Sequence, residues 1–245
     1  MGSFVCCQVW RMRKGDKSRW SHCFSCGKRI AWYDNVPVVS WLVLRGKCRK
    51  CGKKIGVAEI LSEVLMGLVF VGVWWLWPTA ANDGEAGTVA LMAVFLAMLV
   101  GMAVLFIYDM WWRELPVGYL TFCVFCATLY LSLKIWWVLG VAQFSWGNLW
   151  SLAGALLILP GLYFVLYKVS REKWVGSGDW LVALMVALVL ADWWLALVCV
   201  FVANLLGSVV GLVGKKRKLA FGPLLIVGFL VVFFAQNWLV GLINL

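Results

Sequence analysis

The sequence predicts an all-α polytopic membrane protein, a bundle of about seven to eight transmembrane helices with a small cytoplasmic four-cysteine zinc-knuckle insertion. Composition is the first reason: 64% of the 245 residues are hydrophobic, 13% are charged, and the mean hydropathy is +0.92. A soluble domain is about 45–50% apolar and about 25% charged. The second reason is a series of long apolar runs, preceded by a basic segment that contains paired cysteines.

The apolar runs give the helices in order. They lie at 60–78, 88–108, 117–137, 149–168, 179–191, 193–213 and 221–243, and a span needs about 20 such residues. The run 179–191 rises only about 20 Å as a helix. We therefore expect a short, partly water-exposed helix there, entered through irregular backbone at 174–180. Residues 1–10 reach only about 15 Å, and we interpret them as a truncated or partial first transmembrane helix.

The basic residues predict the orientation. Thirteen of the 22 lie between Arg11 and Lys54, ahead of the first long run. If that segment is cytoplasmic, alternating spans put the later basic positions on the same side: Arg113 and the clusters at 168–173 and 215–218. Lys134 is the exception, and the loop 79–87, which has acidic residues and no basic one, falls outside. The net charge of +11 is therefore a positive-inside signal rather than a sign of nucleic-acid binding, because no basic face alternates with stacking aromatics.

Two C-x-x-C-Gly-Lys knuckles in the segment 11–56 predict a structural zinc site. Their ligands are Cys23, Cys26, Cys48 and Cys51. The spacing is close to that of four-cysteine zinc sites, and a glycine after each knuckle allows the positive-φ turn that aims backbone N–H groups at sulfur. A closed four-cysteine site has no open position for a substrate. Two disulfides, a redox site or a metal-free module are the alternatives, although a cytoplasmic position disfavours stable disulfides.

Asp109 and Asp179 are the candidate catalytic pair. Asp109 ends one apolar run and Asp179 opens another, so both are expected at the cytoplasmic ends of spans, facing each other across a pocket. Two carboxylates that share a proton can act as the base for a water molecule and the acid for a leaving group. Gly176 and Gly178 leave room for an extended peptide backbone. The alternative for a single aspartate is a helix cap, which we expect for Asp192.

Taken in order, these motifs resemble the type IV prepilin peptidases, the leader peptidase/N-methyltransferase family of GxGD membrane aspartyl proteases. The resembling segments are GSFVCCQVWR at 2–11, AWYDNVPVVSWLVLRGKC at 31–48, IGVAEILSEVLMGLVF at 55–70, Asp109 seven residues before Pro116, GSGD at 176–179, and KLAFGPLLIVG at 218–228. The sequence departs from the family pattern at Cys6, Val117 and Leu181, and none of these departures removes a candidate carboxylate.

The resemblance implies a zinc module at 11–56 and an aspartyl peptidase bundle at 57–245, in the bacterial inner membrane with its active site facing the cytoplasm. It implies these site residues: catalytic Asp109 and Asp179, with Gly176, Gly178 and Pro116 in support. The substrate would be a prepilin or pseudopilin, cleaved after a short basic leader, and the partners would be membrane lipid and the pilus or type II secretion machinery. S-adenosylmethionine-dependent N-methylation of the new N-terminus is implied by resemblance alone, with no cofactor-binding residues assigned.

Three other classes stay open at this stage. They are another GxGD-type intramembrane protease, a transporter or channel whose aspartates bind cations, and a non-catalytic pilus or secretion assembly protein. A transporter predicts internal repeats and polar residues near the bilayer midplane, whereas this chain has no repeat and its candidate aspartates end or open their runs. A non-catalytic homologue is expected to have lost an aspartate, and both are present.

Overall fold

The computed structural model describes residues 2–15, 20–23, 25–77, 84–139, 145–171, 176–214 and 220–243. The chain divides into two compact units, Met1–Trp75 and Leu76–Leu245. The described residues form helices and no named strand, with two isolated β-bridges in the first unit. The basic cluster at 215–218, Lys173 and much of the acidic loop 79–87 lie outside the described residues.

The first unit consists of two helices and a cysteine-rich segment between them. Its elements are α1 (Gly2–Lys14), the 3-10 helix η1 (Trp32–Asn35), α2 (Val39–Val43) and α3 (Val57–Trp75). α1 packs against α3 through a face in which Val5, Cys6 and Val9 are buried, a spacing that places them on one side of a helix. The thirteen residues of α1 rise about 20 Å, which is less than the roughly 30 Å core of a bilayer.

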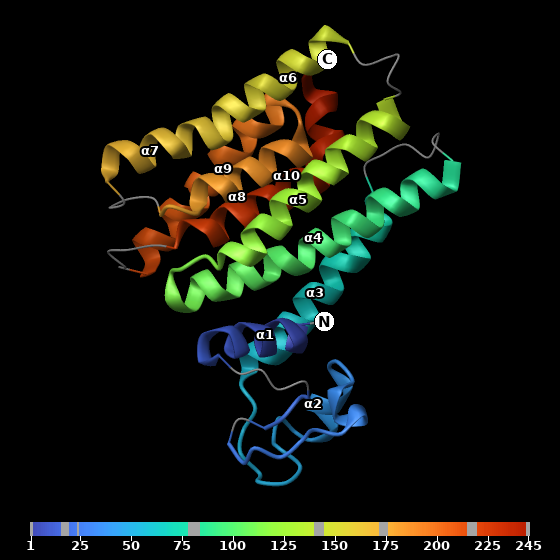
Figure 1. Ribbon diagram of the computed structural model, residues 1–245, viewed down its shortest axis with the longest axis vertical. Coiled ribbons are helices and arrows are strands. Elements are labelled where there is room, and N and C mark those ends of the chain that lie inside the picture. Colours follow the sequence, from blue (N-terminus) through green and yellow to red (C-terminus); the bar gives the residue numbers. More distant parts are fainter. Residues whose placement is uncertain are drawn as a thin grey trace. The chain divides into compact units, whose positions relative to one another are not determined.

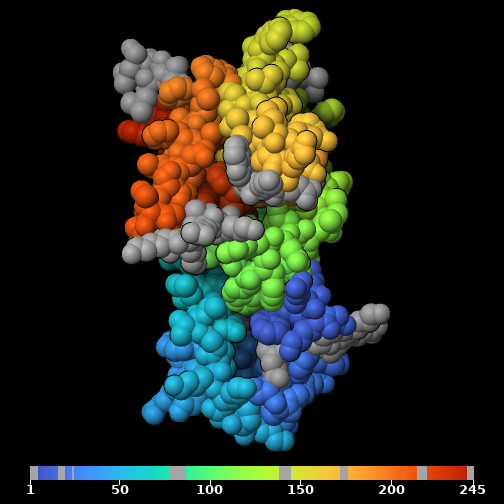
Figure 2. Space-filling model, turned by 90° about the vertical axis from the view of Figure 1, so that its left-hand side faces the viewer, coloured from blue at the N-terminus to red at the C-terminus, as the bar shows by residue number. Residues whose placement is uncertain are grey.

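The second unit is a helical bundle (Figure 1). Its elements are α4 (Gly84–Trp112), α5 (Val117–Leu133), the π-helix η2 (Lys134–Leu139), α6 (Trp146–Leu156), the π-helix η4 (Leu157–Gly161), α7 (Leu162–Ser170), α8 (Asp179–Leu190), α9 (Trp193–Gly214) and α10 (Phe221–Ile243). Pro160 lies in η4 and has no backbone N–H, which is why the helical ladder widens there between α6 and α7. α6 packs against α9, and Figure 2 shows these two helices, in yellow and orange, on one face of the unit.

Six helices of the described part are long and apolar enough to cross a membrane. They are Val57–Trp75, Gly87–Trp112, Val117–Trp137, Trp146–Ser170, Trp193–Val213 and Phe221–Gly241. Each coincides with a predicted run to within a few residues, and the seventh run forms the shorter α8. The predicted all-α, multi-pass membrane fold is thereby confirmed: among the described residues six helices are of full length, and the short α8 and α1 complete the expected set.

α8 lies inside the bundle, where it packs against α5, α6, η4 and α10 (Figure 1). Eight of its twelve residues are buried, and none of the twelve is exposed. Its other four residues are partly accessible, so the expected partial exposure of this helix to water stays a prediction. Its apolar residues face all directions, and such a helix is enclosed by protein or lipid. The entry at residues 176–178 is an irregular turn, as predicted, while 174–175 lie outside the described residues.

α4 and α10 pack against each other and run antiparallel. Phe95 of α4 stacks on Phe233 of α10, with ring centroids 4.3 Å apart. At the end of α4, Asp109 lies against Gly222 in the first turn of α10. Stacked and edge-on aromatic pairs add to the energy of apolar burial. This packing therefore sets the depth at which Asp109 meets the start of α10.

Candidate functional site

Asp109 lies in the last turn of α4, just before the chain reverses into α5. The turn ends the helix at Arg113, whose φ is +57° and whose N–H bonds to the carbonyl of Asp109 at 2.9 Å. Pro116 is the N-cap residue of α5, and its carbonyl accepts the N–H groups of Tyr119 and Leu120. Pro116 therefore supports the reversal that follows Asp109.

Asp179 is held by the glycine turn that precedes α8. The N–H of Gly176 donates to Asp179 Oδ2 at 2.8 Å, and the N–H of Asp179 donates to the carbonyl of Gly176 at 3.2 Å. These two bonds close the turn. The second of them pairs the N–H of Asp179, which is one of the four N–H groups that a helix start leaves without a partner inside the helix. One oxygen of Asp179 is thus fixed by backbone, and the other, Oδ1, points elsewhere.

Gly178 allows the two motifs to touch. A Cβ atom on Gly178 would lie 2.6 Å from Cδ1 and 3.0 Å from Cβ of Leu115, a residue of the turn between Asp109 and Pro116. Real Cβ atoms essentially never approach other atoms to less than 3.0 Å. Glycine at 178 is therefore required for close packing, in addition to any freedom it gives the turn.

Replacing Gly178 by alanine is expected to destabilise the second unit by about 1–3 kcal/mol, the usual cost of overpacking. The added methyl group and Leu115 would compete for one space. In a Leu115→Ala background the same Gly178→Ala substitution should cost less stability than it does in the wild type, because the shortened side chain at 115 leaves space for the added methyl group. Thermal unfolding of the purified protein in detergent measures both effects. A Gly178→Ala protein as stable as the wild type would contradict this explanation of the second glycine.

The structure brings Asp109 and Asp179 together, as their positions at the ends of spans predicted. Both are buried, each with a relative exposure of 6%. A Cβ atom on Gly222 would lie 2.9 Å from Asp109 Oδ2 and 3.5 Å from Asp179 Oδ1. The distance between these two oxygens therefore cannot exceed the sum of these two distances. Asp109 Oδ2 has no hydrogen-bond partner among the described residues. A buried polar atom without a partner is costly, and such atoms often mark functional sites.

Gly222 is the residue of this site that the sequence did not single out. It was quoted only as part of the segment 218–228, and the signal that points to it is weak. Glycine is a poor helix former, yet Gly222 stands in the first turn of α10, next to Pro223. Proline is favoured at a helix start, whereas the glycine needs a separate reason, such as close approach of another group.

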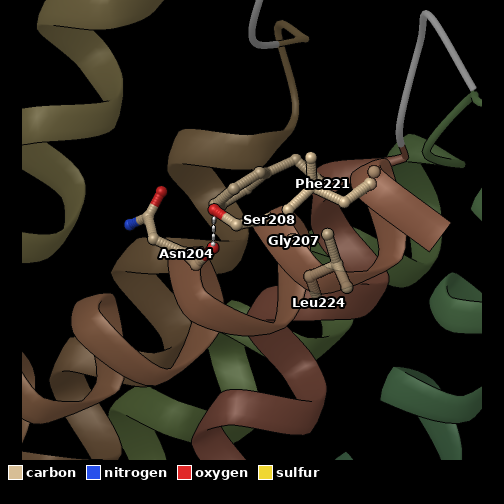
Figure 3. A pocket seen from close by; sticks show the side chains of 7 residues that line it. Asn204, Gly207, Ser208, Phe221 and Leu224 are labelled. Atoms are coloured by element: carbon tan, nitrogen blue, oxygen red, sulfur yellow. Dashed lines mark hydrogen bonds between the residues drawn. The ribbon is translucent and has the colours of Figure 1, made fainter. Parts of the chain in front are cut away.

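A groove opens beside Gly222, between α9 and α10 (Figure 3). It has a volume of about 560 Å³. The lining residues are Asn204, Gly207, Ser208, Gly211, Leu212, Phe221 and Leu224. Its two polar side chains bond to their own helix: Ser208 Oγ donates to the carbonyl of Asn204 at 2.9 Å, and Asn204 Nδ2 to that of Val200 at 2.8 Å. The hydrogen bonds of the groove therefore identify no ligand.

The four predicted cysteines form a cluster that can hold a metal ion. Their Sγ atoms all lie within 4.8 Å of one another, and Cys23 and Cys51 are 3.9 Å apart. Four sulfurs at about 2.3 Å from a tetrahedral zinc ion would be about 3.8 Å apart. Gly27 and Gly52 have φ of +66° and +67°, and each donates its N–H to the carbonyl of the first cysteine of its knuckle, at 2.8 and 2.9 Å. The two turns are thus equivalent, as the sequence predicted.

Charge is unevenly distributed around this cluster. Backbone N–H groups of Cys26 and Ser25 lower the pKa of the Cys23 thiol to about 6. At Cys51 the backbone N–H of Lys53 lowers the thiol pKa, but desolvation and the neighbouring sulfurs outweigh it and raise the pKa to about 11. Lys50 lowers the pKa of Lys28, because the two ammonium groups meet on the protein surface. A metal ion would allow all four thiols to ionise, and the resulting anionic centre would suit the lysines around it.

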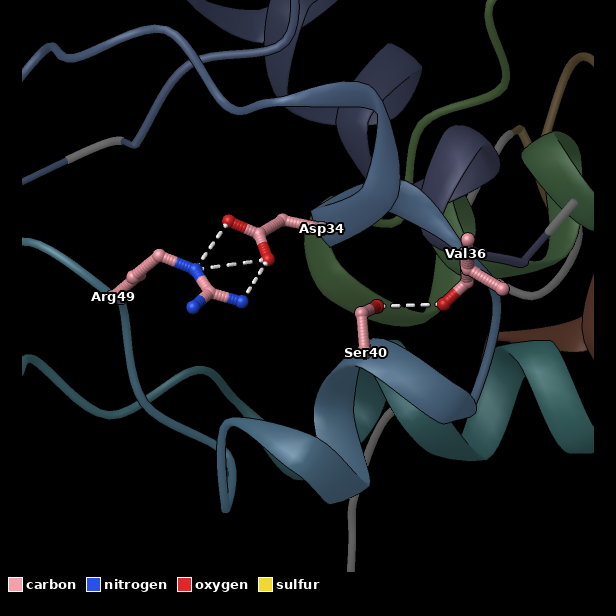
Figure 4. Close-up of polar contacts among 4 residues, drawn as sticks. All are labelled: Asp34, Val36, Ser40 and Arg49. Carbon is pink, nitrogen blue, oxygen red and sulfur yellow. Dashed lines mark hydrogen bonds and ion pairs between the residues drawn. The ribbon is translucent and has the colours of Figure 1, made fainter.

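Asp34 joins the first part of the cysteine-rich segment to the second knuckle (Figure 4). The Nη2 atom of Arg49 lies 2.7 Å from Asp34 Oδ1, and Nε lies 3.0 Å from Oδ2. This fork geometry is the stronger form of ion pair. Nearby, Ser40 Oγ donates to the carbonyl of Val36 at 2.6 Å. The sequence gave no sign of the pairing of Asp34 with Arg49.

Glu63 holds a strained turn in the same unit. Val38 has φ of 61° and ψ of −50°, and the N–H of Val39 bonds to the carbonyl of Pro37 at 2.6 Å. Together these define a γ-turn of the rare, strained form, here at a β-branched residue. Glu63 Oε2 accepts the N–H of Val38 at 2.7 Å. This contact gives Glu63 a physical role in holding the turn.

Asp192 is a helix cap, as predicted. Its Oδ1 accepts the N–H groups of Trp194 and Leu195 at 2.9 and 3.0 Å, and its Oδ2 accepts the Ser151 hydroxyl at 3.0 Å. These are the contacts of an N-cap side chain. The carboxylate is therefore fully used in starting α9, in contrast to Asp109.

The chain is similar to known proteins over most of its length. A family described as the bacterial Peptidase A24 N-terminal domain matches residues 1–77. The prepilin leader peptidase/N-methyltransferase of Myxococcus xanthus is 32% identical, over 78% of this chain and 52% of that protein. Proteins of the same description from Neisseria gonorrhoeae and Xanthomonas campestris are each 30% identical, over 89% and 90% of this chain and 71% and 74% of theirs. No solved structure matches. The chain spans about half the length of the Myxococcus relative.

Proposed function

The chain belongs to the prepilin leader peptidase/N-methyltransferase family, and from this membership we propose that it is a membrane aspartyl endopeptidase that removes the leader peptide of prepilins or pseudopilins. The observation that carries the proposal is the meeting of two buried carboxylates, Asp109 and Asp179, at one point beside Gly222. Among the acidic side chains that the structure describes in the second unit, Asp192 is committed to a helix cap. Asp109 and Asp179 are the buried carboxylates among the described residues, and we assign them as the acid–base group.

In the proposed reaction the two carboxylates share one proton, as close carboxylates in a buried site do. The ionised member takes a proton from a water molecule, which attacks the scissile carbonyl carbon. The protonated member donates to the departing amine as the carbon–nitrogen bond breaks. One new carboxyl terminus and one new amino terminus form, and no covalent intermediate is needed. The fixed Oδ2 of Asp179 sets the orientation of that side chain, while Asp109 Oδ2 is available to the water or substrate.

The distribution of basic residues supports a cytoplasmic position for this site. Arg113 follows α4, and Lys168 and Arg171 lie at the end of α7 and just after it. By alternation of the helices these residues are at the same end of the bundle as Asp109 and Asp179. Cytoplasmic loops carry the excess of lysine and arginine, so the proposed orientation places cleavage at the cytoplasmic face of the bacterial inner membrane.

We assign the cysteine cluster to a structural Zn²⁺ ion. Cys23, Cys26, Cys48 and Cys51 supply four thiolates, which is the ligand set of closed zinc sites, and the sulfur spacing fits a tetrahedral ion. When bound, the ion supplies folding energy to a segment with little apolar core. The Asp34–Arg49 pair then ties the second knuckle to the segment between the knuckles.

N-methylation of the new N-terminus is a second proposed activity. It rests on the names of the relatives, which join the peptidase to an N-methyltransferase. S-adenosylmethionine would be the methyl donor, and no residue of this chain is assigned to bind it. Membrane lipid and the pilus or type II secretion machinery are the further partners that follow from the proposed substrate.

The proposed function can be tested by complementation. The chain and a prepilin are expressed together in bacteria whose own prepilin peptidase gene is deleted, and pilin size is followed on gels. We expect the mature, shorter pilin to accumulate in the membrane fraction with the wild-type chain. Persistence of full-length prepilin for every prepilin tried, with the chain present in the membrane, would count against the peptidase activity.

A further inference from the structure

We propose that Gly222 is a positioning residue of the aspartyl site, and that its missing side chain sets where the unfixed oxygens of Asp109 and Asp179 stand. This inference rests on the proposed function and goes beyond it by adding a third helix, α10, to the two that carry the carboxylates. The first observation is the geometry: a Cβ on Gly222 would lie 2.9 Å from Asp109 Oδ2 and 3.5 Å from Asp179 Oδ1. One methyl group would thus reach both carboxylates at once.

The second observation concerns which oxygens face Gly222. Asp179 Oδ2 is fixed by the N–H of Gly176 at 2.8 Å, so Oδ1, the oxygen toward Gly222, is the one left for chemistry. Asp109 Oδ2 is buried and has no hydrogen-bond partner among the residues that the structure describes. Neither oxygen that meets at Gly222 is held by another side chain or by the turn at Gly176, and the backbone N–H of Gly222 itself approaches the Asp109 carboxylate. Their separation depends on how closely the backbone of α10 approaches.

The third observation is that the glycines of α10 differ in what surrounds them. A Cβ on Gly228 would meet Ala203 Cβ and N at 3.2 Å and the Cys199 carbonyl at 3.3 Å, which is a tight helix–helix contact with α9. A Cβ on Gly241 would meet nothing within 4 Å. One helix thus offers three glycine-to-alanine substitutions: one at the carboxylates, one in packing and one in open space.

These three substitutions separate positioning from packing. Alanine is a better helix former than glycine, so Gly222→Ala should be no less stable to heat than the wild type. Its methyl group would displace Asp109 Oδ2, and misplacement of a reacting group by a fraction of an ångström to an ångström lowers turnover steeply. We expect kcat for prepilin cleavage to fall about ten- to a hundredfold, with KM close to the wild-type value, because substrate binding is untouched. The pH dependence of kcat should also shift, since the two carboxylates no longer share a proton in the same geometry.

The control variants should behave differently. Gly241→Ala is expected to match the wild type in both kcat and thermal midpoint. Gly228→Ala is expected to lower the thermal midpoint while the folded fraction keeps its kcat and pH profile. Wild-type kcat in Gly222→Ala would overturn the inference. So would parallel losses of kcat and thermal midpoint in that variant, because they would indicate packing alone.

A second measurement needs no prepilin and so separates this inference from the proposed function. A water-soluble carbodiimide and a labelled amine modify accessible carboxyl groups, and peptide mass spectrometry gives the labelled fraction at Asp109 and at Asp179. In Gly222→Ala the added methyl group pushes Asp109 from its buried place, so labelling at Asp109 should rise, whereas Gly241→Ala should leave it unchanged. Equal labelling in Gly222→Ala and the wild type would overturn the inference even if the wild type cleaves no prepilin.

Discussion

Asp109→Asn and Asp179→Asn are each expected to abolish prepilin cleavage while the protein remains folded in the membrane. An asparagine amide cannot take or give the proton that the proposed reaction moves. Loss of a general acid or base costs about a hundred- to ten-thousandfold in rate, and one loss disables the pair. Both side chains are buried, so an amide of nearly the same shape should preserve the packing around them. Cleavage by the purified variants, followed by gel mobility of the pilin, measures the effect.

Asp192→Asn is the matched control for these two variants. The substitution is the same and the residue is in the same unit, but Asp192 caps α9, and asparagine is as good an N-cap as aspartate. We expect this variant to cleave at the wild-type rate. Turnover near the wild-type level in either Asp109→Asn or Asp179→Asn would refute the assignment of the pair.

Among the predicted changes, removal of the metal is expected to have the second-largest effect. The effect is on folding, and it should be confined to the cysteine-rich segment. We expect about one zinc per chain, as for a single tetrahedral site. Structural zinc contributes about 10–16 kcal/mol of binding energy to small modules that fold around it. Chelation, or Cys48→Ser, should therefore unfold the segment between α1 and α3. Elemental analysis gives the metal content, and limited proteolysis with mass spectrometry should show new cleavage between residues 20 and 55.

Cys7→Ser is the control for Cys48→Ser, since Cys7 lies in α1, outside the cluster of four sulfurs. It should retain the zinc of the wild type and its resistance to protease. A metal-free wild-type protein with a protease-resistant cysteine-rich segment would contradict the structural role of zinc.

The features that the sequence predicted well are those set by local rules. Each long helix follows from the number of apolar residues that a bilayer requires, and the knuckles follow from the spacing of cysteine and glycine in one short segment. The meeting of Asp109 and Asp179 followed from counting alternating spans. Irregular backbone at Gly176 and Gly178 followed from the glycines themselves.

The features that it missed depend on contacts between distant residues. Hydropathy is the same for a helix in lipid and one inside protein, which is why the burial of α8 was not foreseen. Gly222 acquires its importance only when α10 is packed against α4 and α8. The Asp34–Arg49 pair and the strained turn at Val38 likewise depend on tertiary contacts, and no residue preference indicates a positive φ at valine.

The most direct test of the peptidase assignment is the mass of the pilin after incubation with the purified, vesicle-reconstituted protein and S-adenosylmethionine. The account predicts a pilin shortened by its leader, produced by the wild type and absent with Asp109→Asn or Asp179→Asn. If the proposed methylation also holds, the new N-terminus will be one methyl group heavier only when S-adenosylmethionine is present. An intact prepilin with the wild type, or a shortened one with the two aspartate variants, would contradict the account.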